Sequence, residues 1–129
     1  MRGTWVLSAL LAAVLAAGAA AASQRTITLT KADDGRTVRA HVGDQIVLGL
    51  ASNPSTGYSW KIVKRPAPLR VVSTRYVPPK TKLVGAPGKY VATFAVRTAG
   101  KGTLRLVYVR ATRPPTPAAS TFSVRVVAS

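Results

Sequence analysis

The chain has 129 residues, of which 19 are lysine or arginine and 3 are aspartate or glutamate, so its formal net charge at pH 7 is +16. It has no cysteine, which excludes disulfide bonds, a thiol nucleophile, thiolate metal ligands and lipid modification of a cysteine. The length is typical of a single domain, and the roughly 105 residues after a predicted leader can bury a core that is stabilised by packing alone.

Residues 1–22 are predicted to be a secretory signal peptide. Arg2 precedes an alanine-rich apolar run without a charge, and Ala20-Ala21-Ala22 before Ser23 offers a small-residue cleavage site. An uncleaved membrane anchor is the alternative, because the run is close to the length that spans a bilayer. We expect residues 24–129 to form one domain that is secreted, extracellular or in the cell envelope, with no membrane contact after cleavage.

Beyond the leader, short stretches of alternating apolar and polar residues are separated by glycine, proline and aspartate turn signals, which is typical of β-strands. No stretch there shows apolar residues at helical spacing. Seven or eight short strands predict an all-β fold, an antiparallel β-sandwich. In chain order, the predicted strands are residues 26–30, 38–42, 45–50, 58–63, 71–77, 89–98, 103–110 and 121–128.

The alternation also predicts the core, because every second side chain of a strand faces the same way. Turns are expected at Asp33-Asp34-Gly35 and at Gly43-Asp44. The residues expected to face inward are Ile27, Leu29, Val38, Ala40, Val42, Ile46, Leu48, Leu50, Tyr58, Trp60, Ile62, Tyr90, Ala92, Phe94, Val96, Leu104, Leu106, Tyr108, Phe122, Val124 and Val126.

The stretch from Asn53 to Trp60 joins two predicted strands and is predicted to form a stiff loop with a small tip. Pro54 fixes its own φ and pushes the preceding asparagine away from helix, while Gly57 permits a φ that other residues resist. The two hydroxyl residues between them can bond the nearby backbone. Tyr58 and Trp60 lie on one face of the outgoing strand and can anchor the loop in a core.

Catalytic chemistry has little support in the sequence. His41 is the single histidine and is expected to be an ordinary surface residue, and no G-x-S-x-G motif accompanies it. Paired carboxylates are limited to Asp33-Asp34, which suits a turn better than acid–base catalysis or a calcium loop. The segment 85–89 lacks the spacing of a phosphate-binding loop. We predict that the protein is not an enzyme and has no cofactor or metal.

The excess of basic residues is spread along the chain. There is no run of five like charges, no basic helix and no recognised nucleic-acid motif, so a solvated basic surface is favoured over a specific nucleic-acid site. Such a charge attracts polyanions and speeds association with acidic proteins, an effect that salt weakens.

Five segments together carry a resemblance to a known family. They are Val42-Gly43-Asp44, Ser52-Asn53-Pro54-Ser55-Thr56-Gly57-Tyr58-Ser59-Trp60, Arg75-Tyr76-Val77-Pro78-Pro79, Lys82-Leu83-Val84-Gly85-Ala86-Pro87-Gly88 and Leu106-Val107-Tyr108-Val109-Arg110. In this order they resemble the chagasin family of cysteine-protease inhibitors over nearly the whole chain after the leader. The N-P-S-T-G-Y-S-W element is the most specific of them.

The resemblance implies an immunoglobulin-like sandwich in which three loops at one end form a wedge. In that family the wedge enters the active-site cleft of papain-like cysteine proteases and blocks it without a covalent bond. The first family motif falls on Asn53–Tyr58, with Thr56 expected to approach the catalytic cysteine and histidine of the protease. The second falls on the segment 85–88, along the substrate-binding side, with Pro87 at a position where glycine is common.

The third motif departs from the family pattern. Arg110 matches the family arginine in register, but Ala111 and Thr112 replace the proline and the aromatic residue that follow it. A shift of three residues restores Arg113-Pro114, still without an aromatic residue. Because a rigid aromatic anchor is a common hot spot, its absence predicts weaker inhibition of the usual targets or a different target. The residues expected to contact a protease are Asn53, Pro54, Ser55, Thr56, Gly57, Tyr58, Gly85, Ala86, Pro87, Gly88, Arg110, Arg113 and Pro114.

The predicted function is that of a secreted, reversible, non-covalent inhibitor of papain-like cysteine proteases. It would act as a monomer on a host, competitor or endogenous protease, with no specific nucleic-acid partner. The alternative is a basic immunoglobulin-like module that binds anionic cell-wall or surface polymers without inhibiting a protease. An envelope stability factor with no protease target is a third reading of the same sequence.

Overall fold

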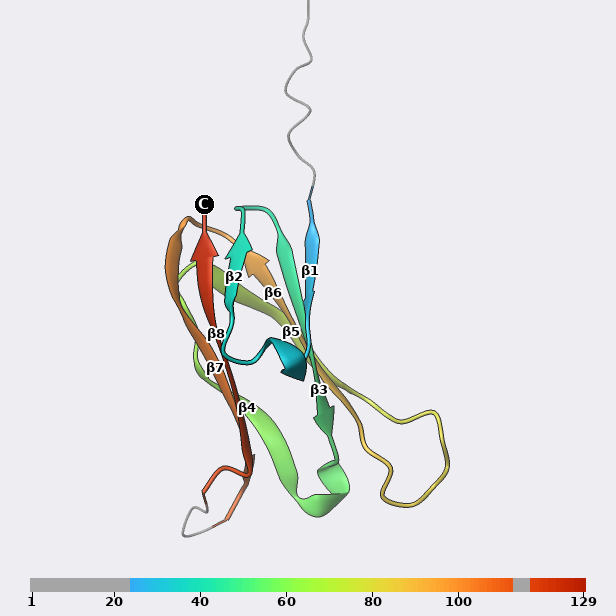
Figure 1. Cartoon of the computed structure of the whole chain (residues 1–129). Coiled ribbons are helices and arrows are strands. Elements are labelled where there is room, and N and C mark those ends of the chain that lie inside the picture. Colours follow the sequence, from blue (N-terminus) through green and yellow to red (C-terminus); the bar gives the residue numbers. More distant parts are fainter. Residues whose placement is uncertain (1–23, 113–116) are drawn as a thin grey trace, which may run out of the picture.

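The structure is a computed structural model that describes residues 24–112 and 117–129. The predicted leader, Arg113 and Pro114 lie outside the described residues. The described chain forms eight strands and two single-turn 3-10 helices (Figure 1). Their bounds are β1 Thr26–Leu29, η2 Lys31–Asp33, β2 Thr37–Ala40, β3 Gln45–Ser52, η3 Pro54–Thr56, β4 Tyr58–Lys64, β5 Leu69–Val77, β6 Gly88–Val96, β7 Gly100–Arg110 and β8 Ser120–Ala128.

The strands form two four-stranded sheets packed face to face, which confirms the predicted all-β sandwich. Sheet A has the order β1-β3-β6-β5, and sheet B has the order β2-β8-β7-β4. Successive strands run in opposite directions along the sandwich (Figure 1). The pairs β3–β6, β5–β6, β4–β7 and β7–β8 are therefore antiparallel. The pairs β1–β3 and β2–β8 are parallel. The two parallel pairs at the sheet edges were not anticipated by the predicted antiparallel sandwich.

The core lies between the sheets and is built from alternate residues of the strands. β8, for example, buries Phe122, Val124 and Val126 while the residues between them face outward, and β3 repeats the pattern. Most of the predicted inward residues are buried, and Ile27, Ile62, Tyr90 and Tyr108 pack partly buried against them. The buried apolar residues are Leu29, Val38, Ala40, Ile46, Leu48, Leu50, Trp60, Leu69, Ala92, Phe94, Val96, Leu104, Leu106, Phe122, Val124, Val126 and Ala128.

Several local details differ from the prediction; for example, β7 begins at Gly100 and not at residue 103, and β6 ends at Val96 and not at residue 98. Val42 is 50% exposed rather than buried, because β2 ends at Ala40 and the chain turns before β3. Lys31–Asp33 forms one turn of 3-10 helix that Thr30 caps, and this helix includes Asp33, the first residue of the turn expected at Asp33-Asp34-Gly35. β5 begins at Leu69, which is 1% exposed and belongs to the core. Each difference lies where a strand begins or ends, the part of a strand that alternation defines least.

Three connections meet at one end of the sandwich, because β3, β5 and β7 all run toward that end (Figure 1). We call residues 53–57, between β3 and β4, the first loop, and residues 78–87, between β5 and β6, the second loop. Residues 111–119, between β7 and β8, are the third loop. The N-terminal end of β1 and the C-terminus of the chain lie at the opposite end (Figure 1).

Candidate functional site

The first loop is closed by hydrogen bonds among its own residues. The Thr56 N–H donates to the Asn53 carbonyl at 3.1 Å, and the Gly57 N–H donates to the Pro54 carbonyl at 2.9 Å. The Thr56 hydroxyl donates to the same Asn53 carbonyl at 2.7 Å, and the Ser55 hydroxyl donates to Asn53 Oδ1 at 2.6 Å. Gly57 ends the turn at φ +86°, in the left-handed region that favours glycine. Backbone and side-chain bonds therefore both fix this turn.

Three aromatic rings support the base of the first loop. Trp60 is buried, and its indole N–H donates to the Ala51 carbonyl at 2.9 Å, which ties β4 to the end of β3. The Tyr108 ring centroid lies 5.0 Å from that of Trp60 and 5.4 Å from that of Tyr58. The Tyr108 hydroxyl oxygen accepts a hydrogen bond of 2.9 Å from the Asn53 N–H. The cluster therefore holds the loop at the residues on both of its sides.

Arg110 extends from the end of β7 onto the first loop. Its Nη2 donates to the Thr56 carbonyl at 2.7 Å, a charge-assisted bond to the tip of the loop. Its guanidinium carbon lies 5.1 Å from the centroid of the Tyr58 ring, within cation–π range. A Cβ on Gly57 would lie 3.3 Å from Arg110 Nε, so glycine also leaves room for this arginine. Arg110 therefore ties the end of β7 to the first loop.

Asn53 joins the first loop to the second. Its Nδ2 donates to the Gly85 carbonyl at 3.0 Å, across 32 positions of sequence. Its Oδ1 accepts from Ser55, and its backbone carbonyl accepts from Thr56, so almost every polar atom of Asn53 is used. A side chain with one amide donor and one amide acceptor fits both tasks, and the single asparagine of the chain occupies the position.

The second loop is longer and is held mainly at its ends. Its internal hydrogen bonds are local and long, from the Leu83 N–H to Thr81 Oγ1 at 3.2 Å and from the Ala86 N–H to the Leu83 carbonyl at 3.3 Å. It overhangs the outer face of sheet A and leaves an open hollow of about 660 Å³, with Gly49 among the residues that line it. Leu83 is 75% exposed and Val84 is fully exposed. The apex of the loop therefore offers two apolar side chains to a partner.

Gly88 marks the return of the second loop into β6. A Cβ at this position would lie 2.2 Å from the carbonyl oxygen of Val77 and 2.6 Å from the hydroxyl of Tyr76. Only glycine allows β5 and β6 to close this tightly at the loop. Gly85 has a positive φ of 83°, and Ala86 and Pro87 complete the segment between the two glycines.

The structure thus brings the predicted residues of the first and second motifs together at one end of the sandwich. Arg110, from the third motif, lies at the same end and contacts the first loop. The Ala119 N–H closes the third loop by donating to the Tyr108 carbonyl at 2.9 Å. Arg113 and Pro114, the alternative register of the third motif, lie outside the described residues.

Two functional features of this end were missed in the sequence. One is the Tyr108 hydroxyl, which bonds the first loop; alternation after Leu106 placed the ring on the inner face but gave no partner for its polar tip. The other is the contact of Arg110 with Thr56, which pairs residues 54 positions apart. A signal for either would have required the pairing of β4 with β7, which places Tyr58 opposite Arg110.

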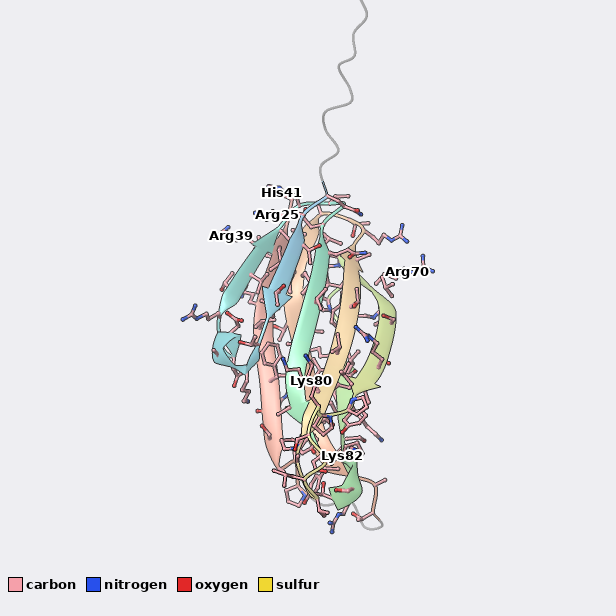
Figure 2. The ribbon with its side chains drawn as sticks, turned by 90° about the vertical axis from the view of Figure 1, so that its right-hand side faces the viewer. Arg25, Arg39, His41, Arg70, Lys80 and Lys82 are labelled. Atoms are coloured by element: carbon pink, nitrogen blue, oxygen red, sulfur yellow. The ribbon has the colours of Figure 1, made fainter. Side chains whose placement is uncertain are left out.

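The single histidine lies in a polar cluster at the opposite end (Figure 2). His41 Nδ1 is 2.9 Å from Ser129 Oγ, but Asp44 accepts from the backbone N–H of His41 at 2.9 Å and not from its ring. This arrangement is not a Ser-His-Asp relay. The hydrogen bond from the His41 N–H, together with bonds and charge from Arg25, holds the pKa of the buried Asp44 carboxyl below its usual value against the opposing effect of burial. The cluster closes the end of the sandwich.

Within residues 24–112 and 117–129, no three histidine, cysteine, aspartate or glutamate side chains are grouped as metal ligands. No helix in the same residues is long and apolar enough to cross a membrane.

A β-sandwich with loops gathered at one end, of which the first is bonded to the second loop and to β7, defines a class of binding protein in which loops carry the recognition. The model of the chagasin family of peptidase inhibitors, I42, matches residues 39–126. Chagasin of Trypanosoma cruzi is 32% identical over 106 residues, which cover 78% of this chain and 96% of chagasin. The chain belongs to the chagasin family of cysteine-protease inhibitors, and members of this family are inhibitors and not enzymes.

Solved structures share the fold. The cysteine protease inhibitor EhICP2 of Entamoeba histolytica superposes with a TM-score of 0.74 at 24% identity, over 82% of this chain and 97% of that protein. The solution structure of amebosin gives a TM-score of 0.63 at 29% identity, over 80% and 97%. PbICP-C, solved in complex with falcipain-2, gives 0.55 at 20% identity, over 83% and 90%.

Proposed function

We propose that this protein is a secreted, reversible and non-covalent inhibitor of papain-like cysteine proteases, and that the three loops enter the protease cleft together. The observation that carries the proposal is the bracing of the first loop, by Asn53 to the second loop and by Tyr108 and Arg110 of β7. Family membership supports the inhibitory role, and the complex of PbICP-C with falcipain-2 supports a protease as the partner.

The bracing matters because a protease cleaves a segment that it can bend into its attack geometry. The first loop already has its tip bonds satisfied internally, so it loses little conformational entropy on binding and resists that bending. The Thr56 hydroxyl donates inside the loop, and the residues beside it are small, so the tip can approach a catalytic cysteine closely. The inhibitor supplies no thiol, so inhibition involves no mixed disulfide.

The second loop supplies the apolar contact in this proposal. Leu83 and Val84 lie at its apex, where binding would remove both side chains from water. The apolar contact of Leu83 and Val84 would replace the contact of the aromatic residue that the third motif lacks after Arg110. Export to the cell envelope or the exterior, which the predicted leader supports, would place the inhibitor where foreign or secreted proteases act.

The test is inhibition of papain and of a cathepsin L-like enzyme by the purified protein, beside a Thr56→Trp variant. The indole would widen the tip of the first loop, and we expect inhibition to fall by at least a hundredfold with the fold retained. Thr26→Trp, at an exposed position near the opposite end of the sandwich, is the matched control and should inhibit like the wild type. Equal inhibition by wild type and Thr56→Trp would exclude the first loop from the contact. A folded wild-type protein without inhibition of either enzyme would refute the proposed target class.

A further inference from the structure

The outer face of sheet B carries a regular array of basic side chains. Every strand of the sheet contributes at least one, and all of them are exposed. They are Arg39 on β2, Arg125 on β8, Lys101 and Arg105 on β7, and Lys61 and Lys64 on β4. We call these six residues the basic face.

Strand register places these residues on one side of the sheet. Arg39, Arg105 and Arg125 each lie between two buried neighbours, so their side chains point away from the core. Lys64 would face inward by simple alternation from Lys61. The irregularity between Ile62 and Lys64 shifts the register and sets Lys64 opposite Arg105 on the outer face.

Across the sheet, four successive rows of outward residues each contain a cation, and the next row, Ser59 opposite Val109, contains none. The rows are Arg39–Val127–Lys101, Thr37–Arg125–Thr103, Ser123–Arg105–Lys64 and Thr121–Val107–Lys61. Neighbouring rows are two residues apart along the strands, which is roughly 7 Å. The positive charge therefore repeats at short, regular intervals along the face, with hydroxyl and valine side chains between the cations.

Among the described residues, no side-chain carboxylate forms an ion pair with a cation of this face. The chain has three acidic residues, and all of them are engaged in the described structure. Asp33 accepts from the Thr30 N–H, and Asp44 binds Arg25 at the end of the sandwich. Asp34, which borders β8, accepts from the Ser123 N–H and pairs with Lys31. Lys64 and Arg105 lie directly opposite each other, an arrangement of like charges that destabilises a sheet unless an anion bridges them.

The outer face of sheet A differs from this pattern. Its strands β1 and β3 present threonine, glutamine, valine, glycine and alanine outward, with no charge among the residues paired in the sheet. Its outward cations are confined to the β5–β6 side, where Arg70 and Arg75 lie on β5 and Lys89 lies on β6. In Figure 2, Arg39 and Arg70 project from opposite sides of the molecule. Outward cations therefore lie on every strand of sheet B, whereas on sheet A they lie on two of the four strands.

We propose that the basic face binds an anionic polysaccharide, a polymer with sulfate, phosphate or carboxylate groups along a sugar chain. A linear polyanion on this face meets a cation in each of these four rows, and the interleaved serine and threonine hydroxyls can bond sugar oxygens. The face has no outward aromatic side chain on which nucleic-acid bases could stack. Among the described residues of sheet B, Val63 is the only large apolar residue that is more than one third exposed, which is too little for insertion into a membrane.

The basic face and the three loops are separate parts of the surface. The loops project from one end of the sandwich, whereas the basic face runs along the side of sheet B. The inference stands independently of protease inhibition, and the two activities are compatible. Together they would hold an inhibitor on an anionic surface with its loops free.

The test uses dextran sulfate as the probe and neutral dextran, which has the same sugar backbone, as its control. The double variant Lys64→Ser with Arg105→Ser removes one row of the basic face. The matched variant Arg70→Ser with Arg75→Ser removes the same charge from sheet A. We expect the first variant to bind dextran sulfate about tenfold more weakly with a flatter salt dependence, and the second to change affinity about twofold. Dextran sulfate should also raise the Tm of the wild type.

Equal losses in the two double variants would overturn the proposal, because binding would then follow net charge and not the basic face. Equal binding of neutral dextran would also overturn it. If single-stranded DNA or anionic phospholipid vesicles bound the basic face more tightly than dextran sulfate did, the assignment to a polysaccharide would be wrong. Inhibition assays on the same variants should give the wild-type result, since neither pair lies in the loops.

Discussion

The first and second loops lie side by side and are built in opposite ways. In the first loop, Asn53, Ser55 and Thr56 bond one another, and Trp60, Tyr108 and Arg110 brace it from outside. The second loop spans twice the length, has few and long internal bonds, and stands over a hollow. In the proposed inhibitory mode, the first loop would resist bending by a protease, and the second would adapt its apolar apex to the enzyme surface.

The largest effect is expected where the second loop is fixed at its end. Gly88→Ala would place a Cβ 2.2 Å from the Val77 carbonyl, and backbone cannot move away cheaply. We expect the free energy of unfolding in urea to fall by about 1–3 kcal/mol. Gly49→Ala is the control, since nothing lies within 4 Å of its added Cβ, and its stability should match the wild type or exceed it. Similar stabilities of the two variants would show that the close approach at Gly88 is not needed.

The next prediction removes the outer brace of the first loop. Arg110→Ala deletes the bond to the Thr56 carbonyl and the contact with Tyr58, and it leaves an exposed site that costs the fold little. We expect inhibition of papain to weaken by about tenfold or more, because a charged hydrogen bond is worth about 1.5–3 kcal/mol. Arg75→Ala, which removes an exposed arginine of β5, should inhibit normally. If Arg110→Ala inhibited papain as strongly as the wild type, the hydrogen bonds within the first loop would be sufficient to hold its tip.

The apolar apex of the second loop provides a third test. Leu83→Ser with Val84→Ser should leave the Tm unchanged, because both side chains are exposed in the free protein. Inhibition should weaken by about 1–2 kcal/mol if both side chains are partly buried against the protease. Val42→Ser with Val63→Ser, at exposed positions away from the two loops, is the control pair. Unchanged inhibition in the apex variant would remove the second loop from the contact.

The smallest expected effect is the dependence of the free energy of unfolding on pH. It should arise in the body of the sandwich and not in the first or second loop. No described residue of the first or second loop is acidic, so acid should weaken the fold before it alters the loops. The pKa of Asp44 is lowered on folding, so its ionised form stabilises the protein above the usual value of 3.8 and this contribution is lost as the pH falls through the lower folded value. Unfolding in urea between pH 5 and pH 2, compared with Asp44→Asn, should show a shallower loss in the variant. An identical pH profile would place the acid sensitivity elsewhere.

Local sequence was sufficient to predict much of the fold and part of the site. Alternation identified all eight strands and nearly all of the core, because the side-chain period of a strand depends only on local backbone geometry. Its errors fell at strand ends, as at Val42 and Leu69, where the period has too few residues to define it. The turn chemistry of Pro54 and Gly57 likewise predicted the first loop from its own residues.

Which strands pair, and which side chains meet, was decided by tertiary structure. The parallel pairs β1–β3 and β2–β8 depend on how successive strands are shared between two sheets, and neither strand encodes that choice by itself. The bonds from Asn53 to Gly85 and from Arg110 to Thr56 join positions 32 and 54 apart, and the rows of the basic face combine residues from all of sheet B. The sequence by itself determined the strands, the first loop and the excess charge, because each follows from residue type and local spacing. Only the packed sandwich determined how the loops brace one another and where the charge gathers, because those properties depend on register between distant strands.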